Sequence, residues 1–215
     1  MKKRLLLVLI LPFFLGCSSI KLIDSWKSKD FQFLKAKKIL IAAKSPNLEI
    51  RKSYETAIAD QLKDHNIDAV MMHKIFPDFE EKERTAPKET DQIIKLFVDK
   101  GIGGVLVTSL KNTIETKKSD TPQRANILEE YEGKSFLAFN NEDDINNTLP
   151  KLSAPENGGT LPTSKTYILE AVTYDLTLEK DRQLVSVSVI DITDPKSASK
   201  VLDNFSKIVS NQFKQ

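Results

Sequence analysis

The 215-residue chain has one cysteine, one tryptophan and two histidines. A single cysteine excludes an intrachain disulfide and any metal site with two or more cysteine ligands. The histidines, His65 and His73, have no evident carboxylate partners in the sequence, which disfavours a zinc or catalytic histidine site. No apolar run reaches the about 20 residues that a membrane-spanning helix needs. The scarcity of cysteine and histidine therefore argues against a metal site or a catalytic thiol.

The N-terminus has the composition of a secretory leader. Residues 1–4 are basic after the initiator methionine, and residues 5–15 are apolar except for Pro12. A short apolar run after a basic start is typical of a signal peptide, which is removed before the mature domain folds. The sequence therefore predicts a signal peptide over residues 1–16.

The end of this leader, Phe14-Leu15-Gly16-Cys17, resembles the lipobox of bacterial lipoproteins. The resemblance implies a diacylglycerol thioether on Cys17, cleavage between Gly16 and Cys17, and a further acyl chain such as palmitate on the new amine. Phe14 stands where leucine is usual. The alternative is an ordinary secreted protein with a free thiol. Serines 18 and 19, rather than aspartate, follow Cys17, and the resemblance then implies sorting to the outer membrane. We expect the periplasmic face, although the sequence leaves periplasmic or surface exposure open.

The mature chain carries no charge excess. Removal of residues 1–16 leaves 199 residues. Three of the 32 basic residues are in the leader, so the mature chain contains 29 basic and 30 acidic residues. Without a positive field, nucleic acid is not an expected partner, and the lipid bilayer is expected to be reached through acylated Cys17.

Hydrophobic periodicity predicts one domain after a polar tether. We expect a lipidated tether over 17–37, then a single α/β domain over 38–215 with a mobile polar insertion at about 111–165. Trp26 and its neighbours could lie extended against the domain, with Trp26 either packed on it or acting as a binding anchor.

The elements predict a mixed sheet. Apolar runs at 38–43, 68–72 and 103–110 alternate with amphipathic helices at 48–65 and 90–100, with Asn66 and Gly101 as helix stops. This β-α-β-α-β order favours three parallel strands. Segments 166–178 and 184–192 predict an antiparallel hairpin with one face more polar, and 197–212 a third helix. The fold class is therefore α/β, a two-layer or three-layer sandwich of about five strands and three helices.

Candidate chemistry in the chain is sparse. Acidic clusters at 78–83 and 141–144 read as solvated loops, although the second could hold a hard cation weakly. Gly101, Gly103 and Gly104 precede a strand rather than follow one, the wrong order for a dinucleotide loop. We expect no catalytic residue, no bound metal and no cofactor.

Several short motifs carry a family resemblance. Asp24-Ser25-Trp26, Tyr174-Asp175 and Leu184-Val185 match a pattern of uncharacterised bacterial lipoproteins, although Ser186 stands where a tryptophan is expected. The layout also resembles the N-terminal domain of the Tol-system periplasmic protein and the lipoprotein activators of peptidoglycan synthases. Those domains bind proteins and catalyse nothing, so the resemblance implies a non-enzymatic interaction module with an envelope protein as partner.

The alternative function is a small-ligand-binding or enzymatic lipoprotein. Its pocket would lie at the C-terminal ends of the parallel strands, where open α/β sheets bind ligands. The residues expected to face that pocket are Met72, His73, Ser109 and Lys111. The sequence leaves the partner and the oligomeric state open.

Overall fold

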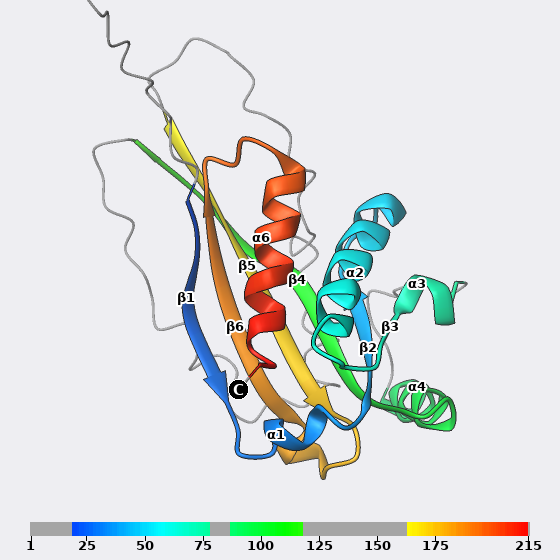
Figure 1. Ribbon diagram of the computed structural model, residues 1–215. Helices are drawn as coiled ribbons and strands as arrows, with labels where there is room; N and C mark the ends of the chain where they lie inside the picture. The colour runs from blue at the N-terminus through cyan, green and yellow to red at the C-terminus, as the bar shows by residue number, and fades with distance from the viewer. Residues whose placement is uncertain (1–18, 78–86, 118–162, 215) are drawn as a thin grey trace, which may run out of the picture.

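The computed structural model describes residues 19–77, 87–117 and 163–214 (Figure 1). Six strands form one sheet in the order β1-β6-β5-β4-β2-β3. The strands are β1 (Ser19–Lys27), β2 (Lys38–Ala43), β3 (Ala69–Met71), β4 (Ile102–Lys117), β5 (Thr163–Asp175) and β6 (Leu184–Thr193). The helices are α1 (Phe31–Leu34), α2 (Leu48–Lys63), α3 (Met72–Ile75), α4 (Pro87–Asp99), α6 (Ala198–Asn211) and the 3-10 helix η2 (Lys180–Arg182).

The predicted α/β fold class and its mixed sheet are confirmed. Strand β2 lies parallel to β3 on one side and to β4 on the other. Strands β4, β5 and β6 then pair antiparallel in sequence order. The right-handed β-α-β preference and the short hairpin connection together account for this order.

The sheet has six strands rather than about five, because residues of the expected tether are part of the fold. Strand β1 pairs antiparallel with β6 and shifts register between Leu22 and Asp24. Ile20 packs against one core cluster and Ile23 against the other, on opposite faces of the sheet. Phe31 and Leu34 of α1 are buried. Residues of β1 and α1 are therefore part of the fold, although the sequence expectation begins the domain at residue 38.

Helices cover both faces of the sheet, so the domain is a three-layer rather than a two-layer sandwich. Side chains of α2 and α6, such as Ile58 and Phe205, share one cluster with Ile39 and Ile41 of β2. The second cluster holds Leu40, which points to the other face of β2, together with Phe97 of α4. Alternation along a strand separates the two cores in this way.

The predicted antiparallel pairing of β5 with β6 is confirmed, but the predicted polar face of this hairpin is not. Strands β4 and β5 are longer than expected, so the insertion begins after Lys117 and ends before Thr163, and residues 118–162 lie outside the described residues. Ser186 and Ser188 are only 2% exposed rather than on a polar face. A register shift near Thr173 also places Val185 in a different cluster from Val187, because a bulge reverses the alternation.

The predicted helix boundaries have clear local causes. The Asn47 side chain accepts hydrogen bonds from the backbone N–H groups of Glu49 and Ile50, which caps α2. Asn66 and Gly101 both take positive φ, 59° and 74°, within three residues of the ends of α2 and α4. These are the left-handed conformations that end helices, so both predicted stops are confirmed.

The Tyr54 hydroxyl in the core gives a first prediction. The ring packs edge-on to Phe205 with centroids 5.6 Å apart, but its buried hydroxyl oxygen has no hydrogen-bond partner among the described residues. Burial raises the pKa of Tyr54, so this phenol stays neutral in the folded state. The unfolded tyrosine ionises near pH 10, and the folded state therefore loses stability as pH rises above that value.

Replacement of Tyr54 by phenylalanine, Tyr54→Phe, should keep the packing and remove the unpaired hydroxyl. We expect the free energy of unfolding at pH 7 to stay equal or rise by about 1 kcal/mol. The advantage over the wild type should grow above about pH 10. Urea unfolding at pH 7 and pH 10.5 measures both effects, and a variant destabilised by several kcal/mol would contradict the assignment.

Candidate functional site

The predicted lipidation site lies just before the folded domain. Gly16 and Cys17 are outside the described residues, so the structure gives no geometry for them. The first described residue is Ser19, which is also the first residue of β1. Only Ser18 separates Cys17 from the sheet.

Strand β1 forms one edge of the sheet. Its inner side pairs with β6, and no strand of the described chain pairs with its outer side. Leu22 and Trp26 on this strand are 39% and 41% exposed. An edge strand presents unpaired backbone N–H and C=O groups that can pair with another chain. Trp26, the one tryptophan in the sequence, thus lies on this edge strand and offers a large apolar surface.

His73, expected to face a ligand, instead binds a buried carboxylate. Its Nδ1 lies 2.6 Å from Glu55 Oε2, and its backbone N–H donates to the same oxygen at 2.9 Å. Glu55 Oε1 accepts from the backbone N–H of Ala43, at the end of β2. The Glu55 side chain is only 1% exposed and that of His73 is 12% exposed. This pair joins α2, α3 and the end of β2, which is a structural role.

Ser109 and Lys111 gather around a second carboxylate. The Ser109 hydroxyl donates to Glu170 Oε1 at 2.5 Å, and Lys111 Nζ lies 4.0 Å from Glu170 Oε2. Ser109 and Glu170 are directly paired across β4 and β5, so their side chains share a face. A register shift after Leu110 turns the chain at Lys111. The Glu170 side chain is only 4% exposed, and its burial as a charged group is costly. The Lys111 ammonium group and the Ser109 hydroxyl offset this cost.

The four residues of the ligand-site prediction therefore do not form one constellation. His73 pairs with Glu55, whereas Ser109 and Lys111 adjoin Glu170. Met72 is 7% exposed and packs in the cluster that contains Phe97. Sequence reasoning missed both glutamates, because their partners come from distant segments and no local spacing reveals such pairs.

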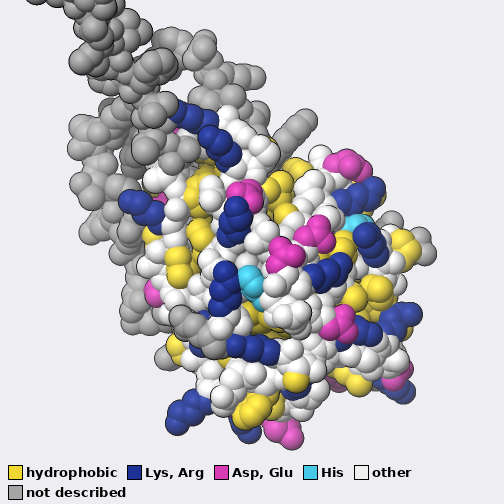
Figure 2. All heavy atoms as spheres, viewed as in Figure 1, with side chains coloured by type: hydrophobic (Ala, Val, Ile, Leu, Met, Phe, Trp, Pro, Cys, Tyr) yellow, Lys and Arg dark blue, Asp and Glu magenta, His cyan; other side chains and the backbone are white. Residues whose placement is uncertain are grey.

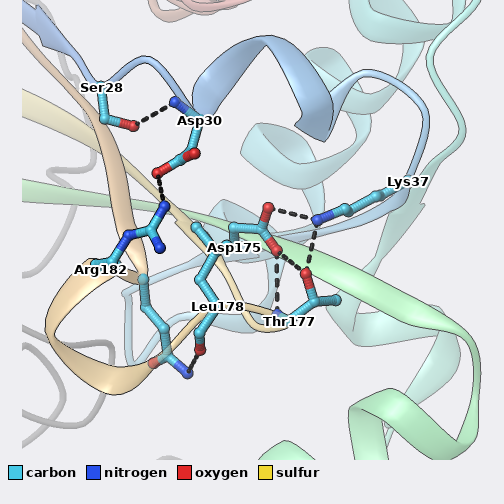
Figure 3. A network of polar contacts seen from close by, with 8 residues as sticks. Ser28, Asp30, Lys37, Asp175, Thr177, Leu178 and Arg182 are labelled. Carbon is cyan, nitrogen blue, oxygen red and sulfur yellow. Dashed lines mark hydrogen bonds and ion pairs between the residues drawn. The ribbon is translucent and has the colours of Figure 1, made fainter.

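A third polar network lies at the end of the sheet opposite to Ser109 and Glu170, where β5 ends (Figure 3). Lys37 Nζ lies 2.5 Å from Asp175 Oδ2 and donates to Thr177 Oγ1 at 2.7 Å. Asp175 Oδ1 accepts from both the backbone N–H and the hydroxyl of Thr177. The Asp175 side chain is fully buried, and that of Lys37 is 24% exposed. The Tyr174-Asp175 motif thus holds the segment after α1 against the end of β5.

Glycines let α1 approach this network closely. A Cβ on Gly104 would lie 2.6 Å from Leu34 Cδ1, and one on Gly103 would lie 3.0 Å from Lys37 Cδ. Both glycines are in β4, which includes the strand expected over residues 103–110. Their role is close packing of α1, and only Gly101 acts as the helix stop.

The described surface over α2 and α6 shows no concentration of one charge. Figure 2 shows lysines and arginines mixed with acidic side chains on the face that carries α2 and α6. The part of the chain that the structure describes contains no group of three or more potential metal-binding His, Cys, Asp or Glu side chains. Among the described helices, none has the length and apolar content needed to cross a bilayer.

Comparisons with known proteins give remote structural similarity. No family model and no curated protein matches the sequence. Similar solved structures include two of the PelC dodecamer from Paraburkholderia phytofirmans. One is of a single-substitution variant, with 11% identity, a TM-score of 0.44, and coverage of 93% of this chain and 100% of that one. The second has 10% identity, a TM-score of 0.44, and coverage of 92% and 98%.

A further similar structure is lipoprotein GNA1162 from Neisseria meningitidis. The identity is 12%, the TM-score is 0.39, and the match covers 82% of this chain and 96% of that chain. One similar structure is therefore a lipoprotein by name, at low identity. Values of this size assign neither a family nor a function, and the predicted relationship to uncharacterised lipoproteins stays a prediction.

Proposed function

We propose that the protein is a lipid-anchored envelope lipoprotein whose α/β domain binds another envelope protein and catalyses no reaction. Acylated Cys17 is the anchor, and the absence of aspartate at Ser18 and Ser19 is the basis for placing it in the outer membrane, where we place the domain at the periplasmic face. The proximity of Cys17 to the sheet supports this arrangement, because an anchor there would hold a folded body rather than a free tail.

The observation that carries the interaction role is the exposed edge of β1. This strand offers an unpaired outer side within the described chain, together with the partly exposed side chains of Leu22 and Trp26. Proteins that bind by strand addition use such an edge, where backbone hydrogen bonds supply affinity and alternate side chains supply specificity. Tryptophan is also enriched among residues that dominate binding energy.

The small-ligand alternative has weaker support. Two of its four candidate residues, His73 and Ser109, hydrogen-bond to buried glutamates, and Met72 is part of the core. Lys111 lies beside the same glutamate as Ser109. Ligand binding at these residues would have to break interactions that stabilise the fold.

A photo-cross-linking amino acid placed at Trp26 tests the interaction role. The intact lipidated protein is irradiated in cells, and the control carries the same amino acid at Lys63 on α2, whose side chain is 51% exposed. We expect one discrete adduct with an envelope protein from position 26 and none from position 63. An equal or absent yield at the two positions would contradict the assignment of β1.

A further inference from the structure

The short link between the anchor and the sheet restricts how the domain can sit on a membrane. Cys17 and Ser19 are two residues apart, so their Cα atoms are separated by at most about 7 Å. Ser19 is already fixed by pairing with Thr193 of β6. The end of the sheet that contains Ser19 must therefore lie close to the membrane if Cys17 carries acyl chains.

The strand register identifies the other residues at this end. Thr193 pairs with Thr166 of β5, and Thr166 with Ile114 of β4, so these residues are level with Ser19. Strands β4 and β5 continue past this level by three residue pairs, to Lys117 and Thr163. Figure 1 shows both strands reaching beyond the start of β1.

The length of this extension matches the reach of the anchor. Ser164 lies two residues beyond Thr166 along β5, about 7 Å farther at the rise of a β-strand. This distance equals the maximum separation of Cys17 from Ser19. When Cys17 is attached to lipid, the end of β5 can thus reach the depth of the anchored residue.

Polar and basic groups occupy this end. Asp194 Oδ1 accepts from the backbone N–H of Lys165, and Asp194 Oδ2 accepts from the Ser164 hydroxyl. The Asp194 carboxylate is thereby bonded to the Ser164 hydroxyl and to the backbone of Lys165. The side chains of Lys165 and Lys196 are exposed, as is that of Lys21, which is paired across the strands with Asp191. Lysines near a bilayer surface are attracted to lipid phosphates.

We propose that the sheet end formed by Ser164, Lys165, Asp194 and Lys196 rests on phospholipid headgroups, with β1 pointing away from the bilayer. This orientation depends on the lipid anchor of the proposed function. It places Trp26 seven residues along β1 from Ser19, about 23 Å farther from the membrane. The exposed edge is then available to a partner at some distance from the lipid.

The competing arrangement lays β1 flat on the bilayer. Trp26 would then lie in the membrane interface, where tryptophan is enriched in membrane proteins. The two orientations differ by the distance of one side chain from lipid, and the chain contains a single tryptophan, so its fluorescence reports on that position alone.

The experiment uses the mature lipidated protein in vesicles of phosphatidylethanolamine and phosphatidylglycerol, with or without bromine on the acyl carbons nearest to the headgroups. Bromine quenches tryptophan at short range. We expect the emission of wild-type Trp26 to be unchanged by brominated lipid. The variant Trp26→Phe with Ser164→Trp should lose most of its emission, and Trp26→Phe with Lys196→Trp provides a second site on the exposed surface.

Flotation of the same samples separates the two proposals. Protein that does not float with vesicles, or floats equally after Cys17→Ser, lacks the lipid anchor, which would overturn the proposed function and this orientation together. Protein that floats through Cys17 but shows quenching of Trp26, or none at positions 164 and 196, would overturn the orientation and leave the anchor intact.

Discussion

Replacement of the lipobox cysteine, Cys17→Ser, should release the protein from the membrane fraction almost completely. The serine hydroxyl cannot form the thioether, and neither cleavage nor amine acylation then follows. Each buried methylene contributes about 0.8 kcal/mol, and two chains already suffice for a stable anchor. Labelling cells with radioactive palmitate, followed by fractionation, measures both acylation and location.

The matched control for this prediction is Ser18→Ala, which changes the neighbouring hydroxyl and keeps the thiol. This variant should retain the label and the membrane fraction. Equal palmitate incorporation in the wild type and in Cys17→Ser would show that Cys17 is not the site of acylation, which would contradict the prediction.

Replacement of Lys37 by methionine, Lys37→Met, should destabilise the domain by about 3 kcal/mol. It leaves the fully buried Asp175 carboxylate without its cation, and an uncompensated buried charge is costly. In an Asp175→Asn background the same change should cost less than about 1 kcal/mol, since no charge remains to be compensated. Urea unfolding of the four proteins gives this coupling directly.

The exposed pair between Arg182 and Asp30 is the control for that cycle. Arg182 Nη2 lies 2.8 Å from Asp30 Oδ2, with side chains 57% and 25% exposed. Arg182→Met should cost much less than Lys37→Met, because solvent screens exposed pairs. A similar cost for Lys37→Met and Arg182→Met would show that the buried network does not hold α1 to the sheet.

Local signals explain why much of the fold was predictable. Continuous apolar runs marked β2 and β4, helical spacing marked α2, α4 and α6, and Asn66 and Gly101 marked helix ends. The sequence suggests an extended segment near Trp26 but does not predict that β1 joins the sheet, because polar residues such as Lys21 and Asp24 interrupt the apolar alternation of this edge strand. Pairing with β6, rather than intrinsic pattern, defines that strand.

The candidate site was less predictable for a different reason. The position of His73 after β3 was correctly inferred, but its partner Glu55 lies on α2, and only the packed helix brings them together. Lys37 and Asp175 are likewise 138 residues apart. Pairs of this kind depend on tertiary packing, whereas the Gly16-Cys17 signal is read from adjacent residues and needs no fold.

The most direct test of the lipid anchor is the intact mass of the protein purified from native membranes. We predict a chain that begins at Cys17, lacks residues 1–16, and carries the added mass of a diacylglycerol and one further acyl chain. A water-soluble protein that retains its leader, or a mature chain with an unmodified Cys17 thiol, would contradict the account.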